Sequence, residues 1–197
     1  MKIVCFSDTH GFHGICEIPE CDILIFAGDY SGLSDILSTM SFAQWMQNQP
    51  AKHKIVVPGN HDYYVNYGEW GDAHVLIGDT VTIEGIKFFG SPYTPEFCGW
   101  NYMKSYPQMQ ELYTKFPEDV DFLITHGAPY GILDEYQKEN IGCKVLKEYV
   151  AKVKPKYHVF GHIHNTGHIS TENTEFYNVS LLDHSYNLVY NLTVLEI

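Results

Sequence analysis

The stretch KIVVPGNHD, residues 54–62, is the segment of the sequence that decides the fold. Its first four residues form a short run of the kind found in buried strands, and glycine, asparagine, histidine and aspartate follow soon after. In α/β proteins, functional side chains gather in the loops beyond the carboxyl ends of the strands. The stretch therefore predicts a buried strand that brings Asn60, His61 and Asp62 to the edge of a sheet.

The same arrangement recurs along the chain. Apolar runs end shortly before a side chain with an oxygen or nitrogen donor at residues 2–6, 22–27, 121–125 and 157–160. The donors that follow them are Asp8, Asp29, His126 and His162. His10 and His164 lie two residues beyond Asp8 and His162, and alternate residues of an extended segment point the same way. Five strands would thus bring these side chains together at one edge.

The remaining pattern completes an α/β chain. Apolar residues at helical spacing between Leu33 and Met46 predict a helix that Ser31 or Ser34 could cap. The other expected elements are strands at 74–77, 80–84 and 86–89, a long loop over 91–117 with a helix near 106–116, a helix at 144–153, and three strands within 167–197. Because the sequence shows no repeat, low-complexity tract or linker, we expect a single domain over residues 1–197.

Composition excludes several classes of function. The formal net charge is −12, and all 12 basic residues are lysines, so extensive nucleic-acid binding is not expected. The five cysteines are scattered without a C-x-x-C pair, which favours reduced thiols in the cytoplasm. A carboxylate and a histidine fall within the first ten residues, which does not suit a signal peptide, and no apolar run reaches membrane-spanning length. The oligomeric state stays open.

The chemistry of the donors indicates metal ions. Carboxylate, imidazole and amide oxygen together suit Mn, Fe, Zn, Ni or Mg better than a soft metal bound by thiolates. Any one of these residues alone could equally cap a helix or turn a loop. Their combination in this order is far more specific than any single member.

The order D-x-H, G-D, G-N-H-D, H-G and G-H-x-H resembles the calcineurin-like metallophosphoesterase superfamily. Further segments are similar to the small metallophosphoesterase-domain-containing proteins, a branch grouped with class III cyclic nucleotide phosphodiesterases. These segments lie at residues 90–92, 95–100, 124–129 and 158–164. The resemblance covers nearly the whole chain and implies a four-layer α/β/β/α sandwich with two metal ions at one edge of the sheets.

The resemblance also implies a role for each motif residue. Asp8, His10 and His164 would hold one metal, while Asn60, His126 and His162 would hold the other. Asp29 would bridge the two ions. His61 would donate a proton to the leaving-group oxygen. Asp62 would orient His61, or would serve instead as a helix-capping carboxylate. Mn²⁺ is the first expectation for the two divalent ions, with Fe, Zn, Ni and Mg as alternatives.

The expected function is a metal-dependent phosphodiesterase that hydrolyses small phosphodiesters, with cyclic nucleotides as one candidate class. A metal-bridging hydroxide would attack the phosphorus, because two close cations lower the pKa of a shared water. A phosphomonoesterase or a nuclease with the same dimetal centre is the alternative, and a non-catalytic metal-binding scaffold is a third. The segment 28–32 lacks the G-D-x-V-D-R-G pattern of the related protein Ser/Thr phosphatases, so that substrate class is disfavoured.

Three residues are candidates for contact with a small phosphate-ester substrate. His13 lies three residues from a predicted ligand, and Phe97 and Trp100 belong to the aromatic loop over residues 93–102. Aromatic rings in that loop could wall a pocket and stack on the substrate. The alternative is that they only pack the loop onto the domain. His158 and His184 are expected to be ordinary core or surface residues.

Overall fold

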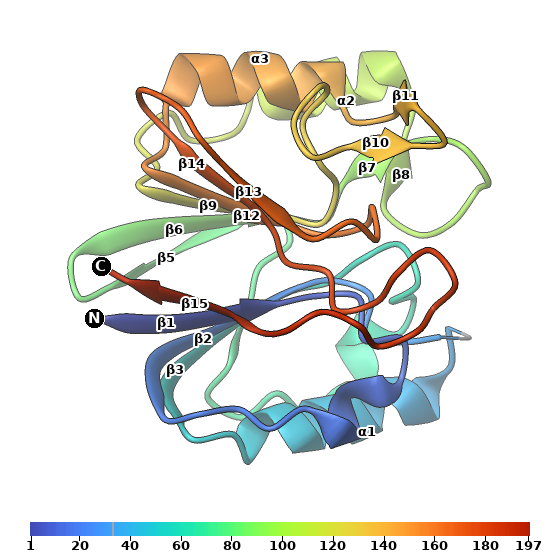
Figure 1. The fold of residues 1–197 in the computed structure, drawn as a ribbon, viewed down its shortest axis with the longest axis vertical. Coiled ribbons are helices and arrows are strands. Elements are labelled where there is room, and N and C mark those ends of the chain that lie inside the picture. The colour runs from blue at the N-terminus through green and yellow to red at the C-terminus, as the bar shows by residue number, and fades with distance from the viewer. Residues whose placement is uncertain (33) are drawn as a thin grey trace.

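Two β-sheets packed face to face form the centre of the protein, and helices cover their outer faces (Figure 1). The computed structural model describes residues 1–32 and 34–197. Figure 1 shows the layers in the order helix, sheet, sheet, helix, so the predicted α/β class is confirmed. No helix in the described part of the chain has the length and apolar character that crossing a membrane requires.

The first sheet carries the opening β-β-α-β pattern expected from the sequence. Its strands run in the order β15-β1-β2-β3-β4. Their bounds are β1 Lys2–Phe6, β2 Cys21–Ala27, β3 Ala51–Val57, β4 His74–Val75 and β15 Thr193–Glu196. Strands β1 to β4 are parallel, whereas β15 pairs antiparallel with β1 at the edge. The carboxyl ends of β1, β2 and β3 therefore meet at one edge of the sheet.

The second sheet has the order β13-β14-β12-β9-β6-β5. Its strands are β5 Asp79–Ile83, β6 Ile86–Ser91, β9 Phe122–Thr125, β12 Tyr157–Phe160, β13 Gly167–Ser170 and β14 Glu175–Asn178. Strands β6, β9, β12 and β14 are parallel, and β5 and β13 are antiparallel edge strands. The expected strands at 74–77, 80–84, 86–89, 121–125 and 157–160 all formed, with ends shifted by a residue or two.

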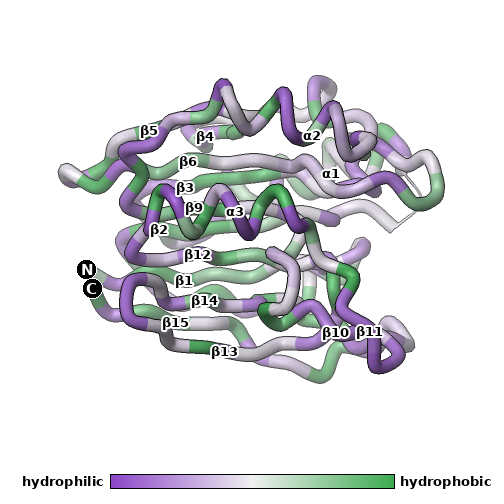
Figure 2. The backbone as a smooth tube through the Cα atoms, turned by 90° about the horizontal axis from the view of Figure 1, so that it is seen from above, coloured by the Kyte–Doolittle hydropathy of each residue, from purple (hydrophilic) through white to green (hydrophobic). Residues whose placement is uncertain are grey.

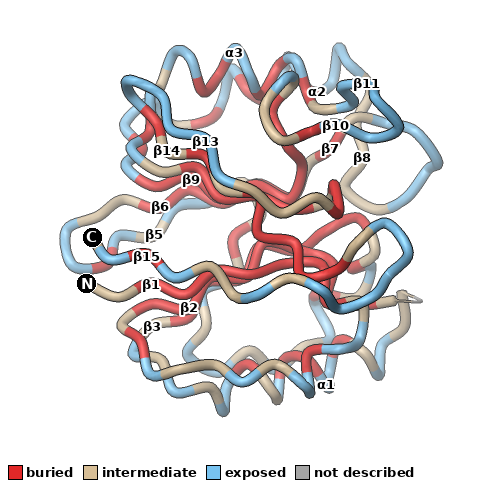
Figure 3. Tube along the Cα trace, in the orientation of Figure 1, coloured by how far each residue is buried: buried red, intermediate tan, exposed pale blue. Residues whose placement is uncertain are grey.

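Burial explains why the central strands read as continuous apolar runs. Residues of both sheets, among them Ile25, Phe88 and Ile124, form one cluster between the sheets. Two further clusters follow, one between each sheet and the helices that cover it. Strands covered on both faces need apolar side chains in both directions, which removes the usual alternation. Figure 2 shows these strands as the hydrophobic centre, and Figure 3 shows that they are the buried part of the chain.

The helices agree with the prediction except at the start of the first helix and at the end of the second, which stops at Tyr113 instead of near residue 116. Helix α1 (Ile36–Gln47) lies on the first sheet, and α2 (Tyr106–Tyr113) and α3 (Lys144–Val153) lie on the second (Figure 1). Asp35, rather than Ser31 or Ser34, caps α1, because its carboxylate accepts the Ser38 N–H at 2.8 Å. The expected participation of Leu33 in this helix falls outside the described residues.

Short elements with no apolar pattern were not foreseen. They are the 3₁₀ turns Phe12–Ile15 and Val65–Tyr67 and the paired strands β7 (Thr94–Pro95) with β8 (Met103–Lys104) and β10 (Glu135–Tyr136) with β11 (Glu139–Asn140). After β14, the chain returns from the second sheet to the first and pairs Ser180 with Ser7 on the way (Figure 1). This returning segment brings residues 183–187 beside the strand ends that carry the predicted ligands.

Candidate metal centre

The strand ends bring all seven predicted metal ligands to one edge of the two sheets. Asp8 and His10 follow β1, and Asp29 and Asn60 follow β2 and β3. His126 follows β9, and His162 and His164 follow β12. Three groups of donor atoms result, each within 4.8 Å of one another: Asp8, His10 and His164; Asp29, His126 and His162; and His10, Asp29 and His61. We call the first two groups the first and second cluster. The first contains the residues that the resemblance assigns to one metal, and the second contains Asp29 with two of the three residues that it assigns to the other. That these residues bind metal stays a prediction.

The backbone at these residues is unusual. Asp8, His10, Asp29 and His162 have φ angles of 54°, 41°, 63° and 69°, in the left-handed region that few non-glycine residues adopt. Such a conformation costs about 1–3 kcal/mol per residue and persists only where the surrounding structure imposes it. Strained residues gathered at one edge in this way are typical of functional sites.

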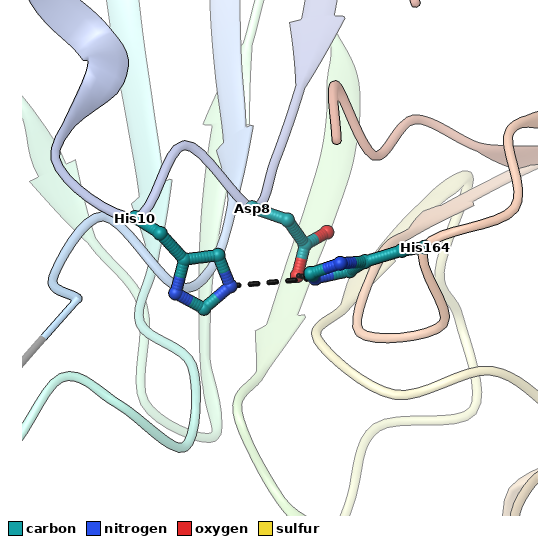
Figure 4. Close-up of side chains that lie close together, drawn as sticks. All are labelled: Asp8, His10 and His164. Carbon is teal, nitrogen blue, oxygen red and sulfur yellow. Dashed lines mark hydrogen bonds and ion pairs between the residues drawn. The ribbon is translucent and has the colours of Figure 1, made fainter. Parts of the chain in front are cut away.

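The first cluster joins segments more than 150 residues apart. Figure 4 shows Asp8, His10 and His164 converging on one point. His10 Nε2 lies 3.3 Å from His164 Nε2, which in turn lies 3.7 Å from Asp8 Oδ1. The Nδ1 atoms of the two rings pair with the carbonyl oxygens of Ser31 at 3.2 Å and Asp183 at 3.0 Å. These bonds fix each ring with Nε2 toward the cluster.

The second cluster is built in the same way. His126 Nδ1 donates to the Ala27 carbonyl at 2.9 Å, so Nε2 faces Asn60 Oδ1 at 2.9 Å and Asp29 Oδ2 at 3.3 Å. The ring of His162 lies 4.9 Å from that of His126. Asp29 Oδ2 is also 3.7 Å from His10 Nε2 in the first cluster. Asp29 therefore belongs to the second cluster and also lies next to the first.

These contacts fit bound cations. With Nδ1 of His10 and His164 occupied as a donor, each of these rings in its neutral form presents a lone pair at Nε2. The two Nε2 atoms face each other at 3.3 Å, a repulsive arrangement that a shared cation converts into coordination. Backbone carbonyls that orient ligand histidines in this manner are the usual outer support of metal sites. The donor set thus suits divalent metal ions.

Charge is concentrated in this buried place. Although burial opposes it, the neighbouring histidines hold the pKa of the Asp29 carboxyl well below its ordinary value. Burial likewise opposes protonation of His126, but the charge of Asp29 raises the pKa of that imidazole to about 9. Burial lowers the pKa of His162 to about 3. The ionised carboxylates give this buried site the negative charge that attracts cations.

Asp62 has a different role from the expected one. Its buried carboxylate accepts the backbone N–H groups of Gly59 at 2.7 Å, Asp29 at 2.9 Å and Ser31 at 3.0 Å. The ring of His61 pairs through Nδ1 with the Gly32 carbonyl at 3.2 Å instead. Asp62 therefore ties the loop after β2 to the loop after β3, and the structure gives it no contact with the His61 ring that would orient the proton donor directly.

His61 lies beside both clusters. Its backbone N–H donates to Asp29 Oδ1 at 2.8 Å, and its ring lies 4.8 Å from the ring of His10. Trp100 stacks on the other side, with ring centroids 4.2 Å apart at an interplanar angle of 29°. Because Nδ1 is taken by Gly32, Nε2 is the ring nitrogen that remains for chemistry.

Two glycines make the close approach possible. A Cβ atom at Gly59 would overlap the Asp29 carboxylate, and one at Gly161 would overlap the side chains of Ser7 and Asp8. Each glycine directly precedes a predicted ligand in the loop after one strand and packs against a predicted ligand from the loop after another strand. The glycines of the G-N-H-D and G-H-x-H motifs are thus required by packing of the clusters.

The clusters open into a cleft of about 600 Å³. Phe97 and Trp100 line it, as expected for substrate contacts. His13 is not among the lining residues: its ring packs 5.2 Å from Phe42 on α1 and Nε2 lies 3.3 Å from Ser41 Oγ. This placement speaks against the expected contact between His13 and substrate. His13 lies within the 3₁₀ turn Phe12–Ile15, and its ring packs against α1.

Several lining residues were not indicated by the sequence, among them Tyr136, His184 and Tyr186. Tyr136 belongs to strand β10, and the other two belong to the returning segment after β14; neither segment carries a recognisable motif. His184 had been expected to be an ordinary core or surface residue. The only signal for this region is the turn-forming composition of residues 183–187, DHSYN.

Comparison with known proteins agrees with this geometry. The family model of calcineurin-like phosphoesterases matches residues 1–166. A UPF0046 protein of Caenorhabditis elegans is 36% identical over 91% of this chain and 69% of its own length. Human metallophosphoesterase domain-containing protein 1 is 32% identical, with 100% of this chain and 71% of the relative covered. The crystal structure of phosphopantetheinyl hydrolase from Mycobacterium tuberculosis shares the fold, with a TM-score of 0.61, 15% identity and coverage of 91% and 88%.

Proposed function

The chain belongs to the calcineurin-like phosphoesterase family, and we propose that it is a metal-dependent phosphodiesterase that acts on small phosphodiesters. The observation that carries this proposal is the pair of donor clusters that Asp29 joins, with His61 next to both. Asp8, His10 and His164 would hold one divalent ion, and Asn60, His126 and His162 the other. Asp29 would contact both ions, for which we propose Mn²⁺ first.

Two cations held in this way supply a nucleophile at neutral pH and stabilise negative charge as the phosphorus is attacked. The protein's own side chains would do the rest. His61 Nε2 would give a proton to the departing ester oxygen, which typically contributes about 10²–10⁴-fold in rate. Asp62 would keep the loops of Asp29 and Asn60 in register through its bonds to their backbones.

The charge of the cleft favours a diester over a monoester. The chain has no arginine, and no lysine is found among the described residues that line the cleft. A monoester carries up to two negative charges, so it would rely on the ions alone, whereas a diester carries one charge and a second organic group that can contact the walls. Cyclic nucleotides are one class of small diester that meets this description.

The test is hydrolysis of bis-p-nitrophenyl phosphate and of p-nitrophenyl phosphate by the purified protein with added Mn²⁺. We expect the diester to give the higher kcat/KM and EDTA to abolish the activity. Turnover of the monoester alone would replace the proposed activity by that of a phosphomonoesterase. An inert protein under Mn²⁺, Fe²⁺, Zn²⁺, Ni²⁺ and Mg²⁺ would favour a metal-binding scaffold instead.

The proposed place of action is the cytoplasm. All five cysteines are free thiols, and three of them, Cys5, Cys21 and Cys143, are buried. Free thiols of this kind suit a reducing compartment, where disulfides are rare. Recovery of the activity in the cytosolic fraction of the source cells would support this placement, and recovery outside the cell would contradict it.

A further inference from the structure

Large apolar side chains gather around the cleft although they remain exposed to solvent. Phe97, Trp100, Tyr136, Ile141 and Tyr186 all line it, and they are 58%, 37%, 41%, 46% and 50% exposed. Exposed apolar residues normally occur singly, and a group of them around a concave site marks a binding surface. These residues approach from separate segments, so no single loop requires them for its own packing.

The cleft has two aromatic sides. The first wall, Phe97 and Trp100, comes from the loop before β8 and includes the ring stacked on His61. The second wall consists of Tyr136, His184 and Tyr186. Tyr136 and His184 pack edge to face at 5.1 Å, and the Tyr186 ring lies 5.0 Å from His10 and 4.9 Å from His164.

A tight turn holds the second wall in place. The Asp183 carboxylate accepts the backbone N–H groups of Ser185 at 2.8 Å and Asn187 at 2.9 Å, and the Asp183 carbonyl accepts that of Tyr186 at 2.9 Å. The same carbonyl oxygen pairs with His164 Nδ1. The turn therefore fixes Tyr186 relative to the first cluster, and a fixed ring loses little conformational entropy when a ligand stacks on it.

The two walls face different parts of a bound diester. His61 would protonate the leaving oxygen, so the leaving group lies on the side of Trp100, which stacks on His61. The ester group that stays on phosphorus is then left to the other side. Among the described residues that line the cleft, Glu96 is the only charged side chain apart from the predicted ligands and the histidines. A retained group with further negative charge would find no lysine or arginine to pair with among these lining residues.

Building on the proposed function, we propose that the second wall binds the retained ester group, and that this group is flat and uncharged. Tyr136 and Tyr186 are then specificity-determining residues for phosphodiesters with an aryl or similarly planar retained group. Stacking between aromatic groups contributes about 0.5–1.5 kcal/mol beyond buried area, which corresponds to about two- to tenfold in kcat/KM.

The test uses two substrates with the same leaving group, bis-p-nitrophenyl phosphate and methyl p-nitrophenyl phosphate, and the Mn²⁺-loaded protein. We expect Tyr136→Ala to lower the ratio of their kcat/KM values by about two- to tenfold, because only the first substrate has a planar retained group. Tyr136 packs on His184 rather than on a predicted ligand, so metal content should be unchanged. Tyr186→Phe should keep the ratio, and Tyr186→Ala should lower it.

Tyr106→Ala is the matched control, since Tyr106 is 52% exposed on α2 and does not line the cleft. Trp100→Ala should slow both substrates together. A binding measurement separates stacking from catalysis: bis-p-nitrophenyl phosphate should bind the metal-loaded His61→Ala protein more tightly than the His61→Ala/Tyr136→Ala protein.

The possible failures are distinguishable. If neither diester is hydrolysed by the unaltered protein, the proposed function is wrong and the inference falls with it. If both are hydrolysed but the ratio is the same in Tyr136→Ala, Tyr186→Ala and the unaltered protein, the proposed function stands and the second wall has no part in specificity.

Discussion

At the scale of single residues, His61 is the side chain whose removal separates chemistry from metal binding. Its backbone N–H, not its ring, holds Asp29 in place. We therefore expect His61→Ala to lower kcat on bis-p-nitrophenyl phosphate by about 10²–10⁴-fold. The metal content, measured by inductively coupled plasma mass spectrometry, should stay near that of the unaltered protein. Loss of metal, or a change in kcat below tenfold, would remove His61 from the role of proton donor.

Asp62, by contrast, is expected to affect the stability of the protein rather than proton transfer. Replacing it with alanine leaves the buried N–H groups of Gly59, Asp29 and Ser31 without their acceptor. Because each buried N–H group left without a partner costs about 1–3 kcal/mol, Asp62→Ala should lower the free energy of unfolding by at least about 3 kcal/mol. Urea denaturation of the metal-free protein measures this. An unchanged midpoint together with reduced kcat would restore the direct catalytic role expected from sequence.

At the scale of elements, the turn after β12 must leave room for the loop after β1. Gly161→Ala should displace Asp8, because its new Cβ would overlap the side chains of Ser7 and Asp8. We expect the variant to fold but to lose at least half of its bound metal in equilibrium dialysis. Gly14→Ala is the control, since a Cβ at Gly14 meets nothing within 4 Å. Equal metal binding by both variants would contradict this packing of the cluster.

Elements buried on both faces were predictable, and exposed ones were not. Strands such as β2 and β12 need apolar side chains on both faces, so the sequence shows them directly. The seven predicted ligands follow such strands, which is why their convergence at one edge could be predicted, whereas their division between two metals came from the family resemblance. Strands β10 and β11 are two residues long and exposed, with no pattern to detect. Tyr136 and Tyr186 could not be assigned to the cleft because only the folded chain brings their segments to it.

At the scale of the whole molecule, a buried histidine couples stability to pH. His158 is fully buried, its Nε2 lies 2.8 Å from Thr125 Oγ1, and burial lowers its pKa to about 3. The unfolded chain, with a histidine pKa near 6.5, binds this proton below pH 6.5 while the folded chain does not. The stabilisation is therefore complete above about pH 6.5 and is lost as the pH falls toward 3.

This loss amounts to at most about 1.4 kcal/mol per pH unit. Urea denaturation of the metal-free protein between pH 7.5 and pH 4.5 should show a shallower dependence for His158→Gln than for the unaltered protein, because glutamine takes up no proton. Parallel curves would mean that His158 is protonated in the folded chain. That the whole chain folds as one domain stays a prediction, which a single cooperative transition in these experiments would support.

The central claim is that two cations bind around a shared Asp29, and a crystal soaked in Mn²⁺ tests it most directly. Anomalous scattering should reveal two peaks roughly 3.5–4 Å apart. One should be coordinated by Asp8, His10 and His164 and the other by Asn60, His126 and His162, with Asp29 in contact with both. No peak among these residues, or a single peak that Asp29 does not touch, would contradict the account.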